Sequence, residues 1–379
     1  MCWVVPTSDA VEKIWDVVVI GAGPAGASAA RVAAAAGADV VLVEKATLPR
    51  YKTCGGGLIG YSLSELPEGF RIPVRQRIDG VRFTRDGRWG RTWRDRDGGD
   101  LLVLVNRAQF DAALTETAKQ AGAQIWEGCA VTGLQESLGR AVLQLADGRR
   151  LLARAVVGAD GSAGRTARYI GVEYGQVDLG LEAEIPVPPD VAAAWAGTVQ
   201  IDWGPIRGSY GWVFPKGDRL SVGVISARGT APRARAYRAQ LIHRLGLSGV
   251  RPDIDSGHLT RCRTLESPLA RGRVLVAGDA AGLLEPWTRE GISFALRSGR
   301  MAGVAAARLA RAGQTEVEAV TAAYRDEIIS ALGPEIASGA KRLAAYERYP
   351  LVVHAAIATL PVAWRRFAEI CRRRASPTG

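Results

Sequence analysis

The chain has 379 residues, of which 47% are hydrophobic and 23% charged, which is ordinary for a soluble globular protein of one large or two intertwined domains. Its formal net charge of +11 would suit a nucleic-acid-binding protein, but only six of the 49 basic residues are lysines. The arginines are scattered along the chain and we find no nucleic-acid motif, so we expect no nucleic-acid partner.

Cysteine and histidine usage argues against two further classes of protein. The five cysteines are widely spaced with no CxxC pair, and the three histidines form no cluster. We therefore expect a reducing compartment, no disulfide scaffold and no metal site. The N-terminus lacks the features of a signal peptide, and no run approaches the roughly 18 apolar residues of a membrane-spanning helix. These observations predict a cytoplasmic protein.

Residues 16–44, DVVVIGAGPAGASAARVAAAAGADVVLVE, predict a strand, a glycine turn, a helix and a second buried strand. The turn has the pattern GxGxxG, whose glycines allow a tight turn, the close approach of a pyrophosphate and helix–strand packing. The helix N-terminus offers free N–H groups to the phosphates. An acid at the end of the second strand can bond an unphosphorylated ribose, as in FAD or NAD. The candidate residues are Gly21, Gly23, Ala25, Gly26, Glu44 and Lys45.

Two later segments repeat the order of strand and helix. Residues 151–171 predict a buried strand that ends in GADG, and residues 271–303 predict a strand VLVAG, a loop and a long helix. Asp160 and Asp279 therefore stand at the carboxyl ends of strands, where open α/β sheets bind ligands. Taken alone, either aspartate could be a helix cap or a turn former.

The intervening segments alternate in polarity. Residues 78–105 and 197–227 predict antiparallel sheet with turns at Asp86–Gly87 and Gly217–Asp218, whereas residues 106–123 and the chain after about residue 315 predict helix. The fold class is α/β: a Rossmann-like FAD-binding domain, an inserted antiparallel β-sheet substrate domain and a C-terminal helical region. The predicted boundaries are 15–65, 100–175 and 262–315 for the first, 66–99 and 176–261 for the second, and 316–379 for the third.

Together these motifs resemble a known family. GAGPAG with Glu44, GADGSAGRTAR and AGDAAGLLEPWTREGI, in this order, resemble the FAD-dependent oxidoreductases of the para-hydroxybenzoate hydroxylase type. Within that group, RYKTCGGG and YGWVFPKGDRLSVGV are similar to the geranylgeranyl reductase family, over about residues 15–310. The family's aromatic motif usually has a proline three residues before its tyrosine, where this chain has Arg207.

The resemblance implies an FAD cofactor and the saturation of C=C bonds in a prenyl (geranylgeranyl-type) chain on a lipid, quinone or chlorophyll-type molecule. It implies that Arg107 reaches the phosphate and ribityl region of FAD and that Asp279 bonds the ribityl chain. The amides of Gly291 and Ile292 would lie beside the flavin ring and stabilise its reduced form. The cofactor contacts implied outside the first unit are Cys54, Gly55, Gly56, Arg107, Asp160, Gly161, Gly278, Asp279, Gly291 and Ile292.

The stretch CGGG contains the predicted catalytic residues Cys54, Gly55 and Gly56. Reduction of an isolated alkene needs a proton donor, a dry pocket and close packing of the substrate against the flavin. The glycines would leave room beside the flavin ring, and Cys54 would offer a small S–H group as the proton donor. The alternative is that Cys54 is only a small buried packing residue.

Tyr210, Trp212 and Phe214 alternate, so on a strand all three face the same side. Core packing alone explains many such stripes, whereas the resemblance implies that this one lines an apolar tunnel. With Pro215, these residues are the predicted substrate contacts.

The tail joins a 14-residue stretch without Asp, Glu, Lys or Arg, residues 351–364, to five arginines close behind. It is too short to span a bilayer but could lie at a membrane interface beside anionic headgroups, which would suit a prenyl-lipid substrate. An ordinary buried C-terminal helix is the alternative.

The scaffold leaves the chemistry open. The same fold hosts FAD-dependent monooxygenases and halogenases that act on aromatic small molecules, although the apolar stripe and CGGG favour reduction. We find no separate nicotinamide domain, so electrons would come from NAD(P)H that binds transiently or from a reduced ferredoxin-like donor.

Overall fold

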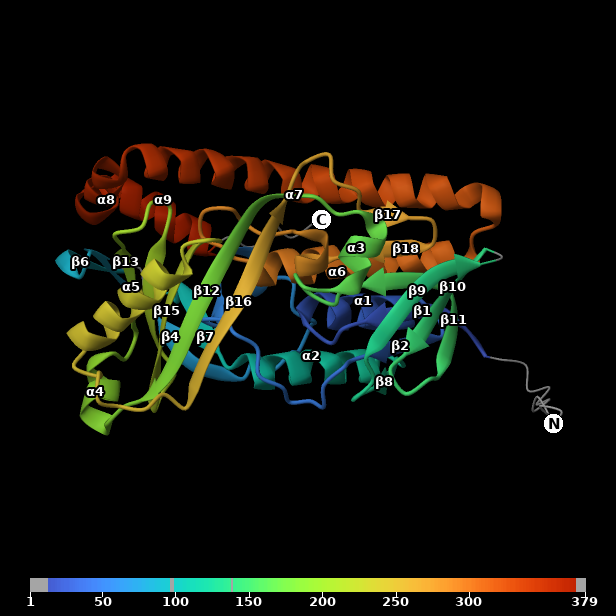
Figure 1. The fold of residues 1–379 in the computed structure, drawn as a ribbon, viewed down its shortest axis with the longest axis horizontal. Coiled ribbons are helices and arrows are strands. Elements are labelled where there is room, and N and C mark those ends of the chain that lie inside the picture. The colour runs from blue at the N-terminus through green and yellow to red at the C-terminus, as the bar shows by residue number, and fades with distance from the viewer. Residues whose placement is uncertain (1–12, 96–98, 138, 373–379) are drawn as a thin grey trace.

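The computed structural model describes residues 13–95, 99–137 and 139–372, which form three sheets flanked by helices (Figure 1). The largest sheet has eight strands and a parallel centre. Its parallel strands, in order across the sheet, are β18 (Val274–Val276), β11 (Arg150–Gly158), β1 (Ile14–Ile20), β2 (Val40–Val43) and β8 (Gln124–Trp126). Antiparallel pairing adds β17 (Ala270–Arg271), β10 (Arg140–Leu145) and β9 (Val131–Ser137).

The parallel strands at the centre of this sheet are buried because their sequences are continuous apolar runs. Val18 pairs with Val41 on one side and with Val156 on the other, and all three are fully buried. Such runs suit a parallel sheet that is covered on both faces. The buried strands predicted within residues 16–44, 151–171 and 271–303 are therefore confirmed.

Helices α1 (Pro24–Ala35), α2 (Arg107–Gln120) and α6 (Ile292–Arg311) pack beside this sheet. The backbones of α1 and α6 approach closely, because Gly299 and Gly303 face the carbonyl oxygens of Ala25 and Ala29, where a Cβ would collide. The shorter helices α3 (Arg165–Ile170) and η2 (Gly278–Ala281) follow β11 and β18. The first turns of several of these helices thus gather near the carboxyl ends of the parallel strands.

The second sheet has seven strands and forms the other half of the molecule (Figure 1). Their order is β16 (Ile254–Arg263), β12 (Tyr174–Pro186), β15 (Arg219–Ala227), β14 (Tyr210–Pro215), β13 (Thr198–Trp203), β5 (Gly80–Arg85) and β6 (Arg88–Arg94). The turns predicted at Asp86–Gly87 and Gly217–Asp218 are confirmed. Helix α5 (Ala231–Arg244) packs on this sheet, and α4 (Pro189–Ala194) lies in the connection after β12.

The antiparallel prediction is wrong at one pairing and holds for the run LLVLV. Strand β13 pairs with β5 in parallel. The run LLVLV does not join the seven-stranded sheet, because β7 (Leu102–Val105) pairs instead with β3 (Gly57–Leu58) and β4 (Val74–Ile78) in a separate three-stranded sheet. All four residues of β7 are buried, so this strand has no solvent face and suits a position between layers. The predicted domain boundaries stay a prediction.

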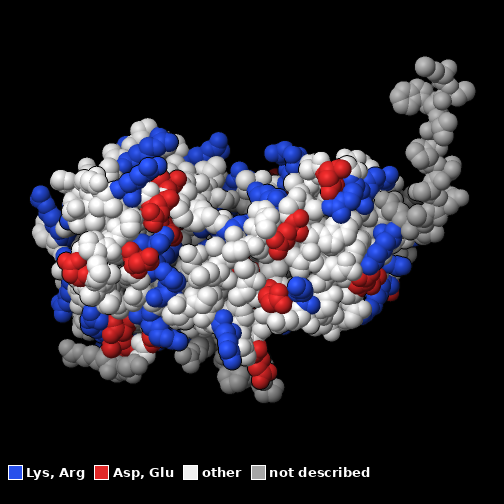
Figure 2. All heavy atoms as spheres, turned by 90° about the horizontal axis from the view of Figure 1, so that it is seen from below, with Lys and Arg blue, Asp and Glu red and all other residues white. Residues whose placement is uncertain are grey.

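The C-terminal helices join the two halves. After η3 (Gln314–Glu316), helix α7 (Val317–Arg348) runs along the length of the molecule, and α8 (Pro350–Thr359) and α9 (Pro361–Arg372) fold back at one end (Figure 1). Ile328 and Leu332 of α7 belong to the core of the parallel sheet, whereas Tyr346 belongs to a core beside the second sheet. Among the described residues, no helix is both long and apolar enough to cross a membrane. Basic side chains are spread over the face that Figure 2 shows, with acidic ones between them.

Candidate active site

In the glycine turn between β1 and α1, two glycines pack tightly against backbone atoms and the third borders open space. A Cβ on Gly21, whose φ is +100°, would collide with the carbonyl oxygen of Ala159, and one on Gly26 would collide with that of Gly21. Gly23 differs, because the nearest atom to its Cβ position is the Arg50 Nη2 at 3.9 Å. Helix α1 starts there without a side-chain cap, so its first N–H groups remain available.

Glu44 is buried at the end of β2 and faces the same turn. Its Oε2 accepts a hydrogen bond from the Ala22 N–H at 2.7 Å, and its Oε1 accepts one from the Ala46 N–H at 3.1 Å. The Nε of Arg50 lies 3.4 Å from Oε1. Lys45, the next residue, is exposed. Glu44 is therefore held rigidly at the turn, whereas Lys45 points to solvent.

Arg107 lies next to Cys54. Its Nε and Nη2 donate to the two carboxylate oxygens of Asp111 at 2.8 and 3.0 Å, and Arg50 Nη1 donates to the same carboxylate at 3.0 Å. Burial alone would lower the pKa of Arg107, but Asp111 and the Cys54 side chain, with which it also hydrogen bonds, raise that pKa. Arg107 is thus a fixed positive charge beside the thiol.

Lys52, His258 and Asp279 come from three distant segments and act on one another electrostatically. Burial lowers the pKa of Lys52, and the nearby Asp279 opposes that shift. Burial, and then the charge of Lys52, lower the pKa of His258 to about 4. The His258 Nε2 lies 3.0 Å from the Ser162 Oγ. His258 is absent from the predicted site, because a single histidine on an alternating strand carries no sequence signal.

Asp160, the other predicted aspartate, caps the start of helix α3. Asp160 Oδ2 accepts hydrogen bonds from the N–H groups of Arg165 and Thr166 at 2.7 and 3.1 Å, at the start of α3. The neighbouring Gly161, at φ +78°, has no atom within 4 Å of its Cβ position. Asp160 thus fixes the turn, and Gly161 leaves open space beside it.

The segment before α6 places backbone beside Asp279 and carries a second acid, Glu290. Gly278, at φ +57°, donates its N–H to Ser298 Oγ at 2.9 Å, and the Cβ position of Gly291 lies 3.3 Å from Asp279 Oδ1. Glu290 accepts hydrogen bonds from the N–H and Oγ–H of Ser293, both at 2.7 Å. Burial raises the pKa of Glu290 to about 7. Ile292, the first residue of α6, is buried.

The chain itself occupies the Cβ side of the glycines after Cys54. A Cβ on Gly55 would lie 2.9 Å from ring carbons of Phe214, and a Cβ on Gly56, at φ +76°, would collide with the carbonyl oxygen of Val105. The Gly56 N–H donates to the Cys54 Sγ at 3.3 Å. The glycines therefore let an aromatic ring and a strand closely approach residues 51–56, which we call the Cys54 segment.

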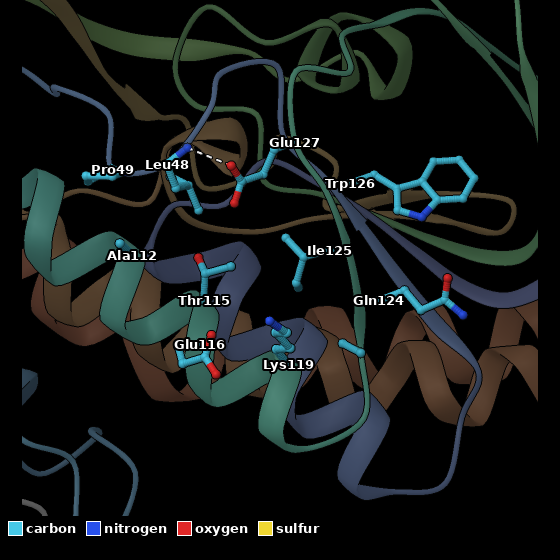
Figure 3. A pocket seen from close by; sticks show the side chains of 11 residues that line it. Leu48, Pro49, Ala112, Thr115, Glu116, Lys119, Gln124, Ile125, Trp126 and Glu127 are labelled. Atoms are coloured by element: carbon cyan, nitrogen blue, oxygen red, sulfur yellow. Dashed lines mark hydrogen bonds between the residues drawn. The ribbon is translucent and has the colours of Figure 1, made fainter.

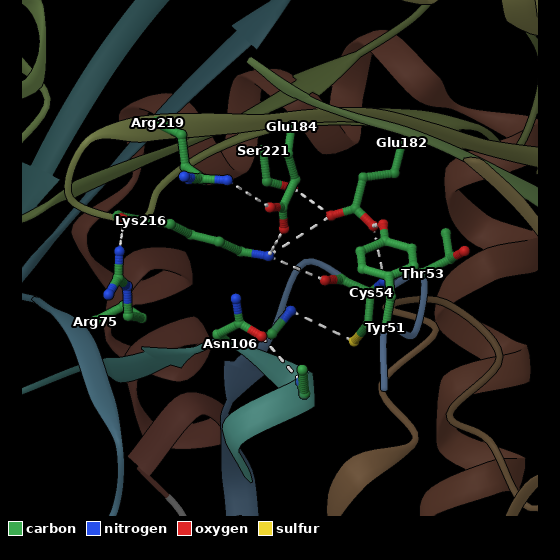
Figure 4. A network of polar contacts seen from close by, with 12 residues as sticks. Tyr51, Thr53, Cys54, Arg75, Asn106, Glu182, Glu184, Lys216, Arg219 and Ser221 are labelled. Atoms are coloured by element: carbon green, nitrogen blue, oxygen red, sulfur yellow. Dashed lines mark hydrogen bonds and ion pairs between the residues drawn. The ribbon is translucent and has the colours of Figure 1, made fainter. Parts of the chain in front are cut away.

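A buried network of charges fixes the Cys54 segment from the seven-stranded sheet (Figure 4). Glu182 of β12 is 0% exposed, and its Oε2 accepts hydrogen bonds from the Tyr51 hydroxyl at 2.9 Å and the Cys54 N–H at 2.8 Å. Its Oε1 accepts one from the Ser221 hydroxyl at 2.6 Å and lies 3.7 Å from the Lys216 Nζ. One carboxylate thus ties both ends of this short segment to the sheet.

Lys216 completes the network. Its Nζ donates to Glu184 Oε1 at 2.8 Å and to the carbonyl oxygen of Cys54 at 3.3 Å, and its side chain is 3% exposed. Arg219 lies 3.7 Å from Glu184 and is partly exposed. The predicted site did not include Glu182, Glu184 or Lys216. The LEAEI alternation, which places both glutamates on one face of β12, was the available signal.

The aromatic stripe has the predicted shared face on β14. The rings of Tyr210 and Trp212 lie 6.4 Å apart, as do those of Trp212 and Phe214. The Tyr210 hydroxyl donates to the carbonyl oxygen of Thr288, and burial raises its pKa. The stripe therefore reaches from the loop before α6 to Gly55. Pro215 is buried at its end.

Arg207, the departure from the family's aromatic motif, has a side chain that is 74% exposed and lies 4.0 Å from Glu347.

A groove of about 710 Å³ lies elsewhere, between α2 and β8 (Figure 3). Leu48 and Pro49 lie at one end of it, where the Leu48 N–H donates to Glu127 Oε2 at 2.9 Å. Thr115 and Lys119 of α2 face Ile125 across it. None of the residues predicted for the site lines this groove.

The comparisons with known proteins identify the class. The family model described as FAD binding domain matches residues 15–319. A digeranylgeranylglycerophospholipid reductase of Methanoculleus marisnigri is 30% identical over 331 residues, 82% of this chain and 81% of the relative. A menaquinone reductase of Mycolicibacterium smegmatis is 31% identical over 312 residues, 76% and 75% of the two chains.

Solved structures share the fold. A geranylgeranyl bacteriochlorophyll reductase-like protein of Thermoplasma acidophilum superposes with a TM-score of 0.80 at 19% identity, over 95% of this chain and 97% of the other. A flavin-dependent brominase superposes with a TM-score of 0.71 at 18% identity, over 95% and 94%. The chain is an FAD-binding oxidoreductase. It belongs to the geranylgeranyl reductase family, as the sequence motifs predicted.

Proposed function

We propose that this protein is an FAD-dependent reductase that saturates C=C bonds of a prenyl chain on a lipid, a quinone or a chlorophyll-type molecule. One observation carries the proposal: the apolar stripe on β14 ends with Phe214 against Gly55, directly beside Cys54. A ring at that position suits contact with hydrocarbon better than with a polar aromatic substrate. The names of the two sequence relatives, a lipid reductase and a quinone reductase, support the same substrate class.

The residues present fit FAD. The open Cβ positions of Gly23 and Gly161 and the uncapped start of α1 leave space and N–H donors for the pyrophosphate. Glu44 would bond the adenosine ribose, and Asp279 with the backbone at Gly291 and Ile292 would bond the ribityl and ring end. The partly buried ammonium of Lys52 would add a positive charge near the reduced ring.

The chain's own residues would then deliver the proton. FAD, once bound and reduced by the electron donor, would supply the hydride for one alkene carbon. The Cys54 thiol would give its S–H proton to the other carbon as the new C–H bond forms, and a thiolate would remain. The guanidinium of Arg107 stabilises the thiolate that remains, because it is held beside the thiol by Asp111. Glu182 holds the Cys54 N–H and thereby orients the thiol. A proton from solvent restores the thiol before the next turnover.

The test uses the purified flavoprotein, reduced without oxygen by dithionite, and a menaquinone or a geranylgeranylated glycerol lipid. Mass spectrometry should find products heavier by two hydrogens for each bond reduced. Cys54→Ala should keep its flavin spectrum and lose about 100-fold or more of the rate, the usual scale of a lost general acid. Cys129→Ala is the matched control, since this thiol is also partly buried but lies outside the site. Full activity in Cys54→Ala would reject the proton-donor role.

A second candidate, an FAD-dependent monooxygenase or halogenase acting on an aromatic molecule, is favoured by the shared fold of the brominase alone. It predicts oxygen-dependent consumption of NAD(P)H with peroxide or an oxygenated or halogenated product, and no hydrogenated prenyl chain.

We propose NAD(P)H or a reduced ferredoxin-like protein as the electron donor of the prenyl reductase. Replacing dithionite with each donor in turn, under nitrogen, separates the two.

A further inference from the structure

We propose that the end of the molecule formed by α8, the start of α9 and strand β6 is a docking surface for an anionic lipid membrane. Nine large hydrophobic side chains are exposed in the described part of the chain, and six of them lie on these elements or on the residues that cap α8. We call these six the α8 patch; their exposed fractions run from 48% to 74%, and they are Trp89, Tyr349, Leu351, Val352, Leu360 and Val362.

The patch lies on one end of the molecule. Helix α8 packs against β5 and β6, and α8 and β6 lie at the same end of the molecule in Figure 1. The Trp93 indole N–H of β6 donates to the carbonyl oxygen of Ile357 at 3.0 Å, and His354 hydrogen bonds with the backbone of Trp89. Trp89 therefore stands next to α8 rather than apart from it.

The inner faces of both helices are already used for packing. His354 and Ile357 of α8 are buried, and Trp364 of α9 stacks on Trp93 with ring centroids 5.7 Å apart and an interplanar angle of 7°. The outer apolar side chains therefore do not serve the core. A concentration of exposed apolar side chains on a rigid surface marks a contact with another apolar phase.

Charge selects the kind of partner. The sequence has no Asp, Glu, Lys or Arg from residue 349 to residue 364. Exposed arginines surround that stretch: Arg348 precedes it, Arg365 and Arg366 follow it, and Arg88 and Arg91 flank Trp89 on β6. The acidic side chains at its edges are Glu347, which faces Arg207, and Glu369. An apolar centre with an arginine rim matches the interface of an anionic bilayer.

A second copy of this chain fits the patch poorly. A two-fold contact would bring each patch against itself and would set one arginine rim against the other, which costs electrostatic energy. A bilayer offers acyl chains to the centre and phosphates to the rim at once. The membrane is therefore the occupant that satisfies both features.

A series of ring contacts connects the patch with the aromatic stripe. Successive ring centroids lie 5.2 to 6.4 Å apart along this series. The rings, in order, are those of Trp93, Trp364, Phe367, Phe83, Trp203 and Tyr210. Docking would set a membrane lipid at the outer end of this apolar series. The connection between docking and the aromatic stripe rests on the proposed function, whereas the docking itself does not.

The experiment floats the full-length, FAD-loaded protein with vesicles of phosphatidylcholine alone or with about one third phosphatidylglycerol. The patch variant replaces Leu351, Val352 and Val362 with Gln, and the matched control replaces the exposed Leu265 and Ile329, which lie away from the patch, with Gln. Wild type and control should float with anionic vesicles, whereas the patch variant should partition roughly tenfold or more weakly, because several apolar groups no longer enter the bilayer. Arg365→Gln with Arg366→Gln should weaken binding to anionic vesicles and reduce its salt dependence.

Three results would overturn the proposal: wild type that stays with the soluble fraction, a patch variant that floats like wild type, and a wild-type dimer in light scattering that the patch variant loses. Flavin absorbance and circular dichroism verify that each variant is folded. Flotation requires no turnover, so a protein that floats but reduces no prenyl chain would refute the proposed function and leave the docking surface in place.

Discussion

Lys216→Met tests whether the buried charge network holds the Cys54 segment. The substitution keeps most of the stem of the side chain and removes the ammonium that lies 2.8 Å from Glu184 and 3.3 Å from the Cys54 carbonyl oxygen. It leaves the carboxylates of Glu182 and Glu184 buried, with the partly exposed Arg219 as the nearest remaining cation to Glu184, at 3.7 Å. An uncompensated buried charge is costly because little water reaches it.

The magnitude follows from burial. Removing one partner of a buried ion pair costs about 3 to 5 kcal/mol, a large part of the 5 to 15 kcal/mol that typically stabilises a folded protein. At about 2 °C for each kcal/mol in a large chain, the melting temperature should fall by roughly 6 to 10 °C. The rate should fall as well, since the Cys54 carbonyl loses its donor, while FAD content stays unchanged.

The assay follows flavin release on heating, with reversible urea unfolding as a second measure. A double variant, Lys216→Met with Glu184→Gln, removes one positive and one negative charge together and should recover much of the lost stability. The reasoning is refuted if Lys216→Met melts within about 1 °C of wild type, or if the double variant is no more stable than the single one.

Three further changes probe neighbouring features. Trp212→Leu should slow the reduction of long prenyl chains more than that of short ones in a chain-length series; an unchanged preference would make the stripe plain core. Glu290 has a folded pKa of about 7, above its unfolded value of 4.5, so its stabilising contribution is complete below about pH 4.5 and is lost as the pH rises through 7. Glu290→Gln should therefore gain on the order of 3 kcal/mol relative to wild type between about pH 5 and pH 8, as measured by urea unfolding, and a pH-independent difference would contradict this. Gly55→Ala places a Cβ 2.9 Å from the Phe214 ring and should cost about 1 to 3 kcal/mol, whereas Gly57→Ala, whose nearest neighbours lie 3.9 Å away, should be tolerated.

The parts of the fold that follow from local sequence could be predicted. The unit over residues 16–44 needs only apolar runs, a helix former and glycines at fixed spacing, and the packing of Gly21 and Gly26 against neighbouring backbone explains why other residues fail there. The shared face of Tyr210, Trp212 and Phe214 likewise follows from strand geometry alone. In each case a single element determines the outcome.

The contacts that depend on which elements meet could not be predicted. Glu182 and His258 lie on strands with alternating polarity, where a polar residue normally faces solvent. Distant segments bury Glu182 and partly cover His258. The run LLVLV has no polar face, so its sequence does not reveal which sheet receives it. The same limit applies to Arg107, whose neighbour Cys54 lies on a separate segment of the chain.

The Cys54 segment shows how local sequence and contacts between distant elements combine. The parallel sheet and its glycine turns form one side of the site, and the antiparallel sheet supplies Glu182, Lys216 and Phe214 from the other side. Neither sheet alone fixes the segment, because its N–H and C=O groups bond to the second sheet while Gly56 packs against Val105 of the third. A substitution that loosens the second sheet should therefore disturb the thiol without disturbing the nucleotide turn. For that reason flavin content and alkene reduction should separate in variants of Lys216, whereas both should fall together in variants of Gly21.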